Sequence, residues 1–273
     1  MKGFAYYNGK FGKRNEISLP LSDRALYFGD GIYELAVGCE GRIFLEDEHI
    51  ERFLSGTREI GIKHGMSFDE ISGLLHRCVN SAGIESFTVY FQMTRSFGTR
   101  RHSYVGCGIN LLITVDEAPT ASEKMLKLIT RPDLRHGYCH VKTLNLLASV
   151  IASGEAEEAG CDEAVLYKNG FVTECAHSSI SVIRDGSLIT HPTNGDILPS
   201  ITRAHLLKAC RDLGIKISER PFSLAELYSA DEIILTSTTK LCARVGDIDG
   251  IKVGGRGSEL YASIRERMIG DCR

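Results

Sequence analysis

Lys142 is the residue whose surroundings most strongly suggest chemistry. It lies in the segment CHVKTLNLLASV at positions 139–150, with Val141, Leu144 and Leu147 among its apolar neighbours. A lysine in such company often rests its aliphatic stem on the core and keeps its ammonium in water. The alternative is an amine held where water is scarce, with its pKa lowered so that it acts as a nucleophile or proton carrier. This segment alone leaves both alternatives open.

An amine of the second kind can hold a carbonyl cofactor such as pyridoxal phosphate, which also needs an acidic partner for its ring nitrogen and donors for its phosphate. Glu174 is a candidate for the acidic partner, because it ends the segment FVTE directly after an Asn169-Gly170 turn. A strand end directs its side chain to a defined point. On position alone, however, an exposed strand-end glutamate is the simpler interpretation.

Two segments are candidates for the phosphate site. Residues 200–202 begin a helix in ILPSITR, where free backbone N–H groups and the helix dipole suit an anion. The hydroxyl-rich TSTT at 236–239 follows a strand, and Arg52 on an earlier helix can supply a fixed charge. Each feature also has an ordinary interpretation, since Ser and Thr commonly cap helices and Arg52 can pair with Glu48 four residues earlier.

A basic cluster follows the segment FTVYFQMTRS. Arg100, Arg101 and His102 stand together in TRRHSY, a combination that can bind a carboxylate or phosphate from a loop. A solvated loop tip is an equally reasonable interpretation of the same residues.

The composition is that of a globular protein. The chain has 273 residues, 43% of them apolar and 25% charged, with a net charge of -3, which fits two domains of ordinary size. This charge predicts no general attraction to nucleic acid or to an anionic membrane. Nine cysteines without a CxxC pair suggest reduced thiols in a cytoplasmic protein, and we expect no metal site, signal peptide or membrane span.

Hydrophobic periodicity predicts an α+β fold of two domains. In the first half, hairpins are expected around Asn8-Gly9 and Glu40-Gly41, and strands at 87–96 and 109–116. Helices are expected at 46–61 and after a capping box that begins at Ser67. The polar stretch EAPTASEKM predicts a boundary, so we expect an N-terminal domain at 1–117, a linker at 118–124 and a C-terminal domain at 125–273.

The second half is expected to alternate strands and helices. The sequence predicts a strand in KLITRP, a helix at 145–159, and hairpins on Asn169-Gly170 and Asp185-Gly186. Further along, it predicts a helix at 201–213, a strand in KISERPF, a short helix capped by Ser223, a strand in DEIILTSTT and a last helix at 258–268.

With these elements in order, the chain resembles the fold-type IV, or class IV, pyridoxal-phosphate aminotransferases over nearly its full length. Within them it is most similar to the D-amino-acid aminotransferases. The resemblance rests on DRALYFGDGIYE (23–34), EHIERF (48–53), YFQMTRSFGTRRH (90–102), KTLNLL (142–147), GCDEAVLYKNGFVTE (160–174), THPTNGDILPSITR (190–203) and TSTT (236–239). It implies an N-terminal antiparallel sheet with helices and a C-terminal pseudo-barrel α/β domain.

The resemblance also implies an activity: transamination between a D-amino acid, such as D-alanine, and a 2-oxo acid, such as 2-oxoglutarate, through an internal aldimine on Lys142. Lys142 would then move a proton between the substrate Cα and the cofactor C4′. The other implied pyridoxal 5′-phosphate ligands are Glu174 at the pyridinium, Leu198 against the ring, and Arg52, Ile201, Thr202, Ser237 and Thr238 around the phosphate.

For the substrate carboxylate, the resemblance implies Tyr33 together with Arg100 and His102, the latter two reaching across a homodimer interface. The chain departs from the usual pattern at Arg101, at Pro199-Ser200 and in the segment CAHSS at 175–179, where His177 is expected simply to pack. Three alternatives remain open: a branched-chain L-amino-acid aminotransferase, a 4-amino-4-deoxychorismate lyase of the same fold, and a binding module that keeps the pocket without the chemistry.

Overall fold

The computed structural model describes residues 3–96, 100–119 and 124–271. Its contacts divide the chain into two compact units, one formed by Met1–Thr120 with Val141–Asn145 and the other by Ala121–His140 with Leu146–Arg273. The expected C-terminal domain at 125–273 included the short segment 141–145, which packs with the first unit instead. Each unit has its own hydrophobic core and is described by itself.

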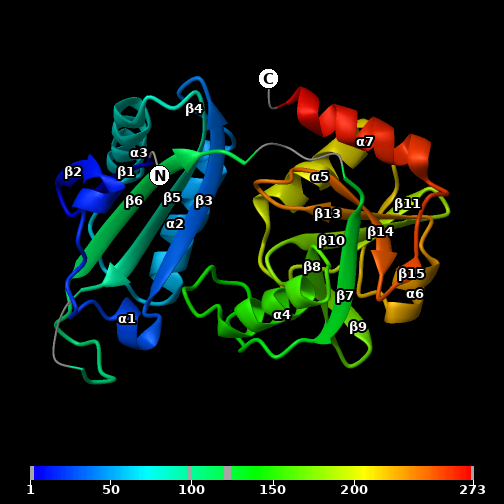
Figure 1. Ribbon diagram of the computed structural model, residues 1–273, viewed down its shortest axis with the longest axis horizontal. Coiled ribbons are helices and arrows are strands. Elements are labelled where there is room, and N and C mark those ends of the chain that lie inside the picture. Colours follow the sequence, from blue (N-terminus) through cyan, green and yellow to red (C-terminus); the bar gives the residue numbers. More distant parts are fainter. Residues whose placement is uncertain (1–2, 97–99, 120–123, 272–273) are drawn as a thin grey trace. The chain divides into compact units, whose positions relative to one another are not determined.

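The first unit is built on a six-stranded antiparallel sheet with the strand order β2-β1-β6-β5-β3-β4 (Figure 1). Its strands are β1 (Gly3–Tyr7), β2 (Lys10–Lys13), β3 (Gly31–Cys39), β4 (Arg42–Ile43), β5 (Ser86–Arg95) and β6 (Ile109–Glu117). The hairpin expected at Asn8-Gly9 joins β1 to β2, and both turn residues have positive φ, as a tight two-residue turn requires. The Glu40-Gly41 hairpin joins β3 to β4 in the same way.

Helices α2 (Glu46–Glu59) and α3 (Phe68–Ala82) pack on this sheet. Ser67 caps α3 through the expected capping box with Glu70, which satisfies backbone N–H groups that have no partner within the helix. Ile50 and Phe53 of α2, together with Leu75 of α3, enter the core against the sheet. A short 3-10 helix (Arg14–Glu16) and α1 (Ala25–Phe28) were not predicted.

The second unit contains a curled sheet of nine strands with the order β12-β11-β10-β13-β14-β7-β8-β9, and β15 pairs with β14 (Figure 1). Its strands are β7 (Leu126–Pro132), β8 (Glu163–Lys168), β9 (Phe171–Cys175), β10 (Ser179–Arg184), β11 (Ser187–Thr190), β12 (Ile217–Glu219), β13 (Glu232–Thr236), β14 (Ala243–Ile248) and β15 (Ile251–Lys252). The last two strands were missed in the sequence. The fold class expected from the sequence is confirmed.

The described part of the second unit contains four helices: α4 (Leu147–Glu158), α5 (Ile201–Asp212), α6 (Leu224–Ser229) and α7 (Ser258–Gly270). The alternation of β13 explains the layering, because Ile233 and Leu235 face one core while Ile234 faces a second core with α5 and α7. Helix α4 packs through the small residues Ala152 and Ala156. Among the helices of the described residues, none is long and apolar enough to cross a membrane.

Candidate active site

Lys142 lies beside the start of β3. The Tyr33 N–H donates to the Lys142 carbonyl at 3.0 Å, and the Leu144 N–H donates to the Gly31 carbonyl at 3.0 Å. Gly31 is needed here, because a Cβ would come within 2.6 Å of the Met93 backbone carbonyl oxygen. The Lys142 ammonium lies 4.3 Å from the centre of the Tyr33 ring, a cation–π distance. The structure therefore brings together two of the residues singled out in the sequence.

Arg52 is held by an acid that the sequence analysis did not single out as a site residue. Its Nε donates to Glu34 Oε1 at 2.6 Å and its Nη2 donates to Glu34 Oε2 at 2.9 Å, so the fork is bidentate. His49 Nδ1 lies 2.8 Å from the same Oε2. Burial alone would raise the pKa of Glu34, but Arg52 and His49 outweigh it and lower this pKa to about 2. The structure shows Arg52 paired with the buried Glu34, beyond the surface pair with Glu48 that was considered as an alternative.

Glu34 and His49 could have been found from periodicity. Glu34 falls on the buried face of β3 and His49 on the buried face of α2, and both are nearly or fully enclosed. A charged or polar residue at a position that the apolar pattern assigns to the core must have a partner.

Arg100 and His102 are exposed and lie near one aromatic residue of α1. The Arg100 guanidinium is 5.6 Å from the Phe28 ring centre, and the His102 ring is 5.4 Å from it. Residues 97–99, which precede Arg100 in the loop, lie outside the described residues. The two expected carboxylate ligands are thus neighbours in the first unit.

Glu174 is buried at the end of β9, with 6% of its surface exposed. This burial excludes the interpretation as an exposed strand-end glutamate. Its Oε1 accepts from the Leu198 N–H at 3.1 Å and also from Arg135 Nη1. The expected cofactor ligands Glu174 and Leu198 are therefore joined by a hydrogen bond within the second unit.

Arg135 is the main site residue that sequence reasoning missed. Its Nη2 donates to Asp133 Oδ2 at 2.6 Å, and Thr173 Oγ1 donates to the same carboxylate at 2.7 Å. Burial alone would raise the pKa of Asp133, but the hydrogen bonds and charge of Arg135 lower it. Arg135 lies in an irregular segment between β7 and α4 that has no periodicity, so no local pattern distinguishes it.

The expected phosphate ligands of the second unit lie at a helix start and a strand end. The Ser200 hydroxyl caps α5 by accepting from the Arg203 N–H at 3.1 Å, and the N–H groups of Ile201 and Thr202 belong to the first turn, where the helix itself offers no acceptor. Ser237 and Thr238 follow β13, and the Ser237 hydroxyl accepts from the Lys240 N–H at 3.3 Å. Both features are of the kind that binds anions.

His177 was expected to pack, but its side chain is 52% exposed. Its Nε2 lies 3.3 Å from Glu163 Oε2 and 3.3 Å from Lys240 Nζ. Glu163 is fully buried and also accepts from Lys240 Nζ at 3.0 Å. The charged partners of His177 come from distant parts of the chain, and for this reason its local surroundings in the sequence did not indicate them.

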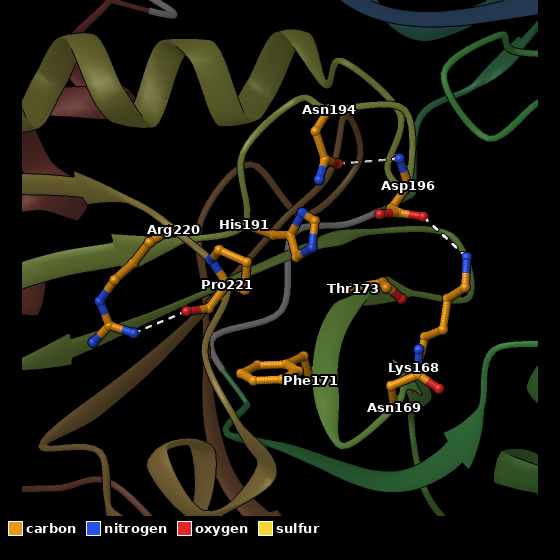
Figure 2. A pocket seen from close by; sticks show the side chains of 9 residues that line it. All are labelled: Lys168, Asn169, Phe171, Thr173, His191, Asn194, Asp196, Arg220 and Pro221. Carbon is orange, nitrogen blue, oxygen red and sulfur yellow. Dashed lines mark hydrogen bonds and ion pairs between the residues drawn. The ribbon is translucent and has the colours of Figure 1, made fainter.

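A separate pocket of about 600 Å³ opens in the second unit beside β9. Figure 2 shows its lining: Lys168, Asn169, Phe171, Thr173, His191, Asn194, Asp196, Arg220 and Pro221. None of the expected site residues is among them. Its two cationic side chains are already paired, Lys168 with Asp196 and Arg220 with Glu226, so we assign the pocket no role.

The comparison with known proteins decides the family. The family model described as "Amino-transferase class IV" matches residues 31–248. The chain belongs to the class IV aminotransferases. It is 34% identical over 253 residues to a D-alanine aminotransferase of Bacillus licheniformis, covering 91% of this chain and 89% of the relative. It is 32% identical over 277 residues to a D-alanine aminotransferase of Listeria monocytogenes, covering 97% and 96%.

Solved structures show the same class IV fold. A branched-chain aminotransferase from Thermoproteus uzoniensis with norvaline matches with a TM-score of 0.89 at 23% identity, covering 98% of this chain and 95% of that one. A branched-chain amino acid aminotransferase from Escherichia coli matches with a TM-score of 0.87 at 22% identity, covering 98% and 93%. At this level of identity the likeness establishes the fold alone.

As a class IV aminotransferase, the protein is an enzyme that uses pyridoxal 5′-phosphate. Its residues fit the demands of that cofactor in kind: an amine at Lys142, a buried and anchored carboxylate at Glu174, and anion-binding donors at the start of α5. When bound, the cofactor supplies an electron sink for charge that develops at the substrate Cα.

Proposed function

We propose that this aminotransferase moves the amino group of a D-amino acid, such as D-alanine, to a 2-oxo acid, such as 2-oxoglutarate. The observation that carries the proposal is the placement of Arg100 and His102 on one exposed loop, 5.6 Å and 5.4 Å from the centre of the Phe28 ring. A guanidinium and an imidazole suit the recognition of a substrate carboxylate. Identities of 31–34% to proteins named D-alanine aminotransferase support the same substrate class.

In this proposal Lys142 would hold the cofactor through its amine and would carry the proton that leaves the substrate Cα. Glu174 keeps the ring nitrogen protonated, and Arg135 holds Glu174 in place through its hydrogen bond. Tyr33, beside the Lys142 amine, lines the substrate pocket. The remaining proposed cofactor ligands are Leu198 at the ring and Arg52, Ile201, Thr202, Ser237 and Thr238 at the phosphate.

We further propose that the enzyme is a homodimer. Leu147, Val150 and Ile151 of α4 are more than half exposed, and so are Leu134 and Tyr138 in the segment that precedes it. Apolar side chains gathered in this way mark an interaction surface. A second copy of the chain is the proposed occupant, and the loop of Arg100 and His102 would then serve the site of the other subunit. The eight free cysteines among the described residues support a reducing, cytoplasmic location.

The first experiment is a visible absorption spectrum of the purified holoenzyme, before and after addition of D-alanine or, separately, L-leucine. We expect D-alanine alone to bleach the cofactor band, because amino transfer converts the aldehyde cofactor to its amine form. Bleaching by L-leucine alone would contradict the proposal and assign the enzyme to the branched-chain class. Formation of 4-aminobenzoate from 4-amino-4-deoxychorismate would instead assign the lyase reaction.

A pair of lysine variants tests whether the amine is at Lys142. Lys142→Ala should bind the cofactor weakly and lose essentially all turnover, because both proton transfers use its amine. Lys168→Ala is the matched control, since Lys168 is 59% exposed and pairs only with Asp196 among the described contacts. Ordinary turnover in Lys142→Ala would refute the assignment of the amine to Lys142. No cofactor band in the wild-type protein with added pyridoxal phosphate would favour a pocket without this chemistry.

A further inference from the structure

The basic loop that carries Arg100 and His102 is tied to a buried arginine of the first unit. Arg24 lies just before α1, and its side chain is 7% exposed. Its Nη1 donates to the Arg101 carbonyl at 2.7 Å and, more weakly, to the Ser103 carbonyl at 3.4 Å, while its Nη2 donates to the His102 carbonyl at 3.1 Å. One guanidinium therefore contacts three consecutive carbonyls of the loop.

The orientation of Arg24 is set by Asp30. Arg24 Nε donates to Asp30 Oδ2 at 2.6 Å, and the guanidinium lies 4.7 Å from the centre of the Phe28 ring. Asp30 is 10% exposed, and its other oxygen accepts from Arg95. The Arg95 guanidinium in turn lies 4.0 Å from the ring centre of Tyr104, two residues after His102. A single carboxylate thus orients two arginines that contact successive parts of the loop.

We propose that Arg24, oriented by Asp30, is a positioning residue that fixes the loop of Arg100 and His102 in the conformation that binds the substrate carboxylate. This inference rests on the proposed function, because it assigns carboxylate binding to that loop. It also gives a role to the segment DRALYFGDG, which supplies both Arg24 and Asp30 but contains none of the expected ligands.

Backbone carbonyls explain why an arginine is needed at position 24. The planar guanidinium presents its N–H donors in a fixed fork, so it can reach several carbonyls and a carboxylate at once. A lysine keeps the charge but has a single nitrogen, which cannot cover the same set of acceptors. Because Arg24 binds the backbone carbonyls of the loop, the Arg100 and His102 side chains are left free of that contact, and both are exposed.

The contacts of Arg24 also separate this role from general stability. When Arg24 is removed, Asp30 retains Arg95 as its partner. The neighbouring Asp23 belongs to a different network, in which its Oδ2 accepts from Thr94 at 2.9 Å and from Asn110 at 2.7 Å. These bonds to β5 and β6 do not pass through Arg24. The sheet should therefore survive a substitution that releases the loop.

Steady-state kinetics of the holoenzyme test the proposal with Arg24→Met and Arg24→Lys. We expect both to raise the KM for D-alanine and 2-oxoglutarate by about 10-fold to 100-fold, the scale of a small misplacement of binding groups. The affinity for pyridoxal phosphate should stay within about twofold of the wild type, because the loop is not part of the proposed cofactor site. Arg14→Met is the matched control, since Arg14 makes a surface pair with Asp116 in the same unit.

Hydrogen exchange provides a readout that does not depend on activity. The amides of Val105 and Cys107 are bonded within the loop, to the Ser103 hydroxyl and the Tyr104 carbonyl. Exchange of the peptide that spans 100–107 should become faster in Arg24→Met and Arg24→Lys, but not in Arg14→Met. If Arg24→Met proves too unstable to study, Arg24→Lys carries the test alone.

The outcomes are distinct. Unchanged exchange in a folded Arg24 variant overturns the inference, and so does faster exchange with an unchanged KM. Wild-type kinetics in Arg24→Lys would show that charge alone suffices and would also overturn it. Failure of the proposed function would give a different result, because the wild-type enzyme itself would then not accept D-alanine.

Discussion

Each unit contains a buried glutamate that is paired with an arginine, but the two pairs differ in which partner positions the other. Both oxygens of Glu34 are bonded to Arg52, and one also contacts His49, so the acid is enclosed and its surroundings fix the direction of the guanidinium. At Glu174, Oε1 accepts from both Arg135 and the Leu198 N–H, while Asp133 binds the same arginine through Nη2. In the first pair the acid positions the cation; in the second the cation positions the acid.

The electrostatics follow the same division. Burial would raise the pKa of Glu34, but the charge of Arg52 and the hydrogen bonds of His49 and Arg52 lower it to about 2, so its charge serves to hold Arg52. In the second unit, burial alone would lower the pKa of Arg135, but Asp133 and Glu174 raise it above its ordinary value. Arg135 is therefore a permanent cation, and it holds Glu174 through a charge-assisted hydrogen bond. We expect the two glutamates to differ in what their loss impairs.

The largest expected effect is a loss of turnover when Glu174, the acid bound by Arg135, is replaced by a neutral residue. Glu174→Gln removes the carboxylate that would keep the ring nitrogen protonated, and we expect kcat to fall by about 100-fold or more, the scale of losing one electrostatic partner of a reacting group. Glu174→Asp should recover part of the loss. Glu155→Gln, which removes a surface partner of Arg131, is the control. A kcat for Glu174→Gln within a few-fold of the wild type would refute the role.

The matching change at Glu34 should act mainly on stability. Glu34→Gln leaves Arg52 without a buried counter-charge, and we expect a loss of about 3 kcal/mol in the free energy of unfolding. Asp116→Asn breaks the exposed pair with Arg14 in the same unit and should cost less than about 1 kcal/mol. Denaturant titrations measure both. Equal losses in the two variants would show that Glu34 is no anchor.

The contribution of Glu34 to stability should also appear in the pH dependence of unfolding. The pKa of Glu34 is lowered from 4.5 to about 2, so its ionisation contributes stability that is fully present above about pH 4.5 and is lost as the pH falls toward 2. The lowering corresponds to roughly 3 kcal/mol over that range. Wild type and Glu34→Gln should therefore converge in stability below pH 4.5. A difference that stays constant from pH 7 to pH 3 would contradict the lowered pKa.

The smallest changes exchange each arginine for lysine. Arg52→Lys loses the bidentate fork to Glu34, and we expect the Kd for pyridoxal phosphate to rise by about tenfold with kcat little changed. Arg135→Lys should lower kcat by about tenfold with little change in that Kd, because it disturbs the acid at the ring. If both variants alter kcat, or both alter the Kd for pyridoxal phosphate, the two glutamate–arginine pairs do not have the different roles proposed here.

Local turn chemistry made much of the fold predictable. Asn8-Gly9, Asn169-Gly170 and Asp185-Gly186 each mark a tight hairpin, and all six residues have positive φ in the structure. The missed hairpin between β14 and β15 carries the same signal at Asp249-Gly250. The sequence did not predict it, because β14 contains Gly246 and Asp247 and shows no regular alternation of apolar and polar residues.

The candidate site was less accessible to sequence reasoning. Lys142 and Glu174 stand out because each lies in or beside a regular pattern. Arg135 does not, because its bond to Glu174 spans 39 residues and starts from an irregular segment. Of the apolar residues near Lys142, Val141 is buried, whereas Leu147 and Val150 are exposed because α4 packs through Ala152 and Ala156. Long-range pairing is not encoded in any single window of sequence.

The segment 141–145 has a consequence for the order in which the enzyme is built. Its backbone completes the start of β3, through the bonds of Lys142 to Tyr33 and of Leu144 to Gly31, although it is synthesised after β7 of the second unit. A nascent chain that ends at residue 120 therefore contains all six strands of the first sheet but lacks the piece that closes the edge at Gly31–Tyr33. Lys142, the residue on which catalysis is proposed to depend, belongs to that segment. The first unit is therefore completed only when Lys142 has been added to it.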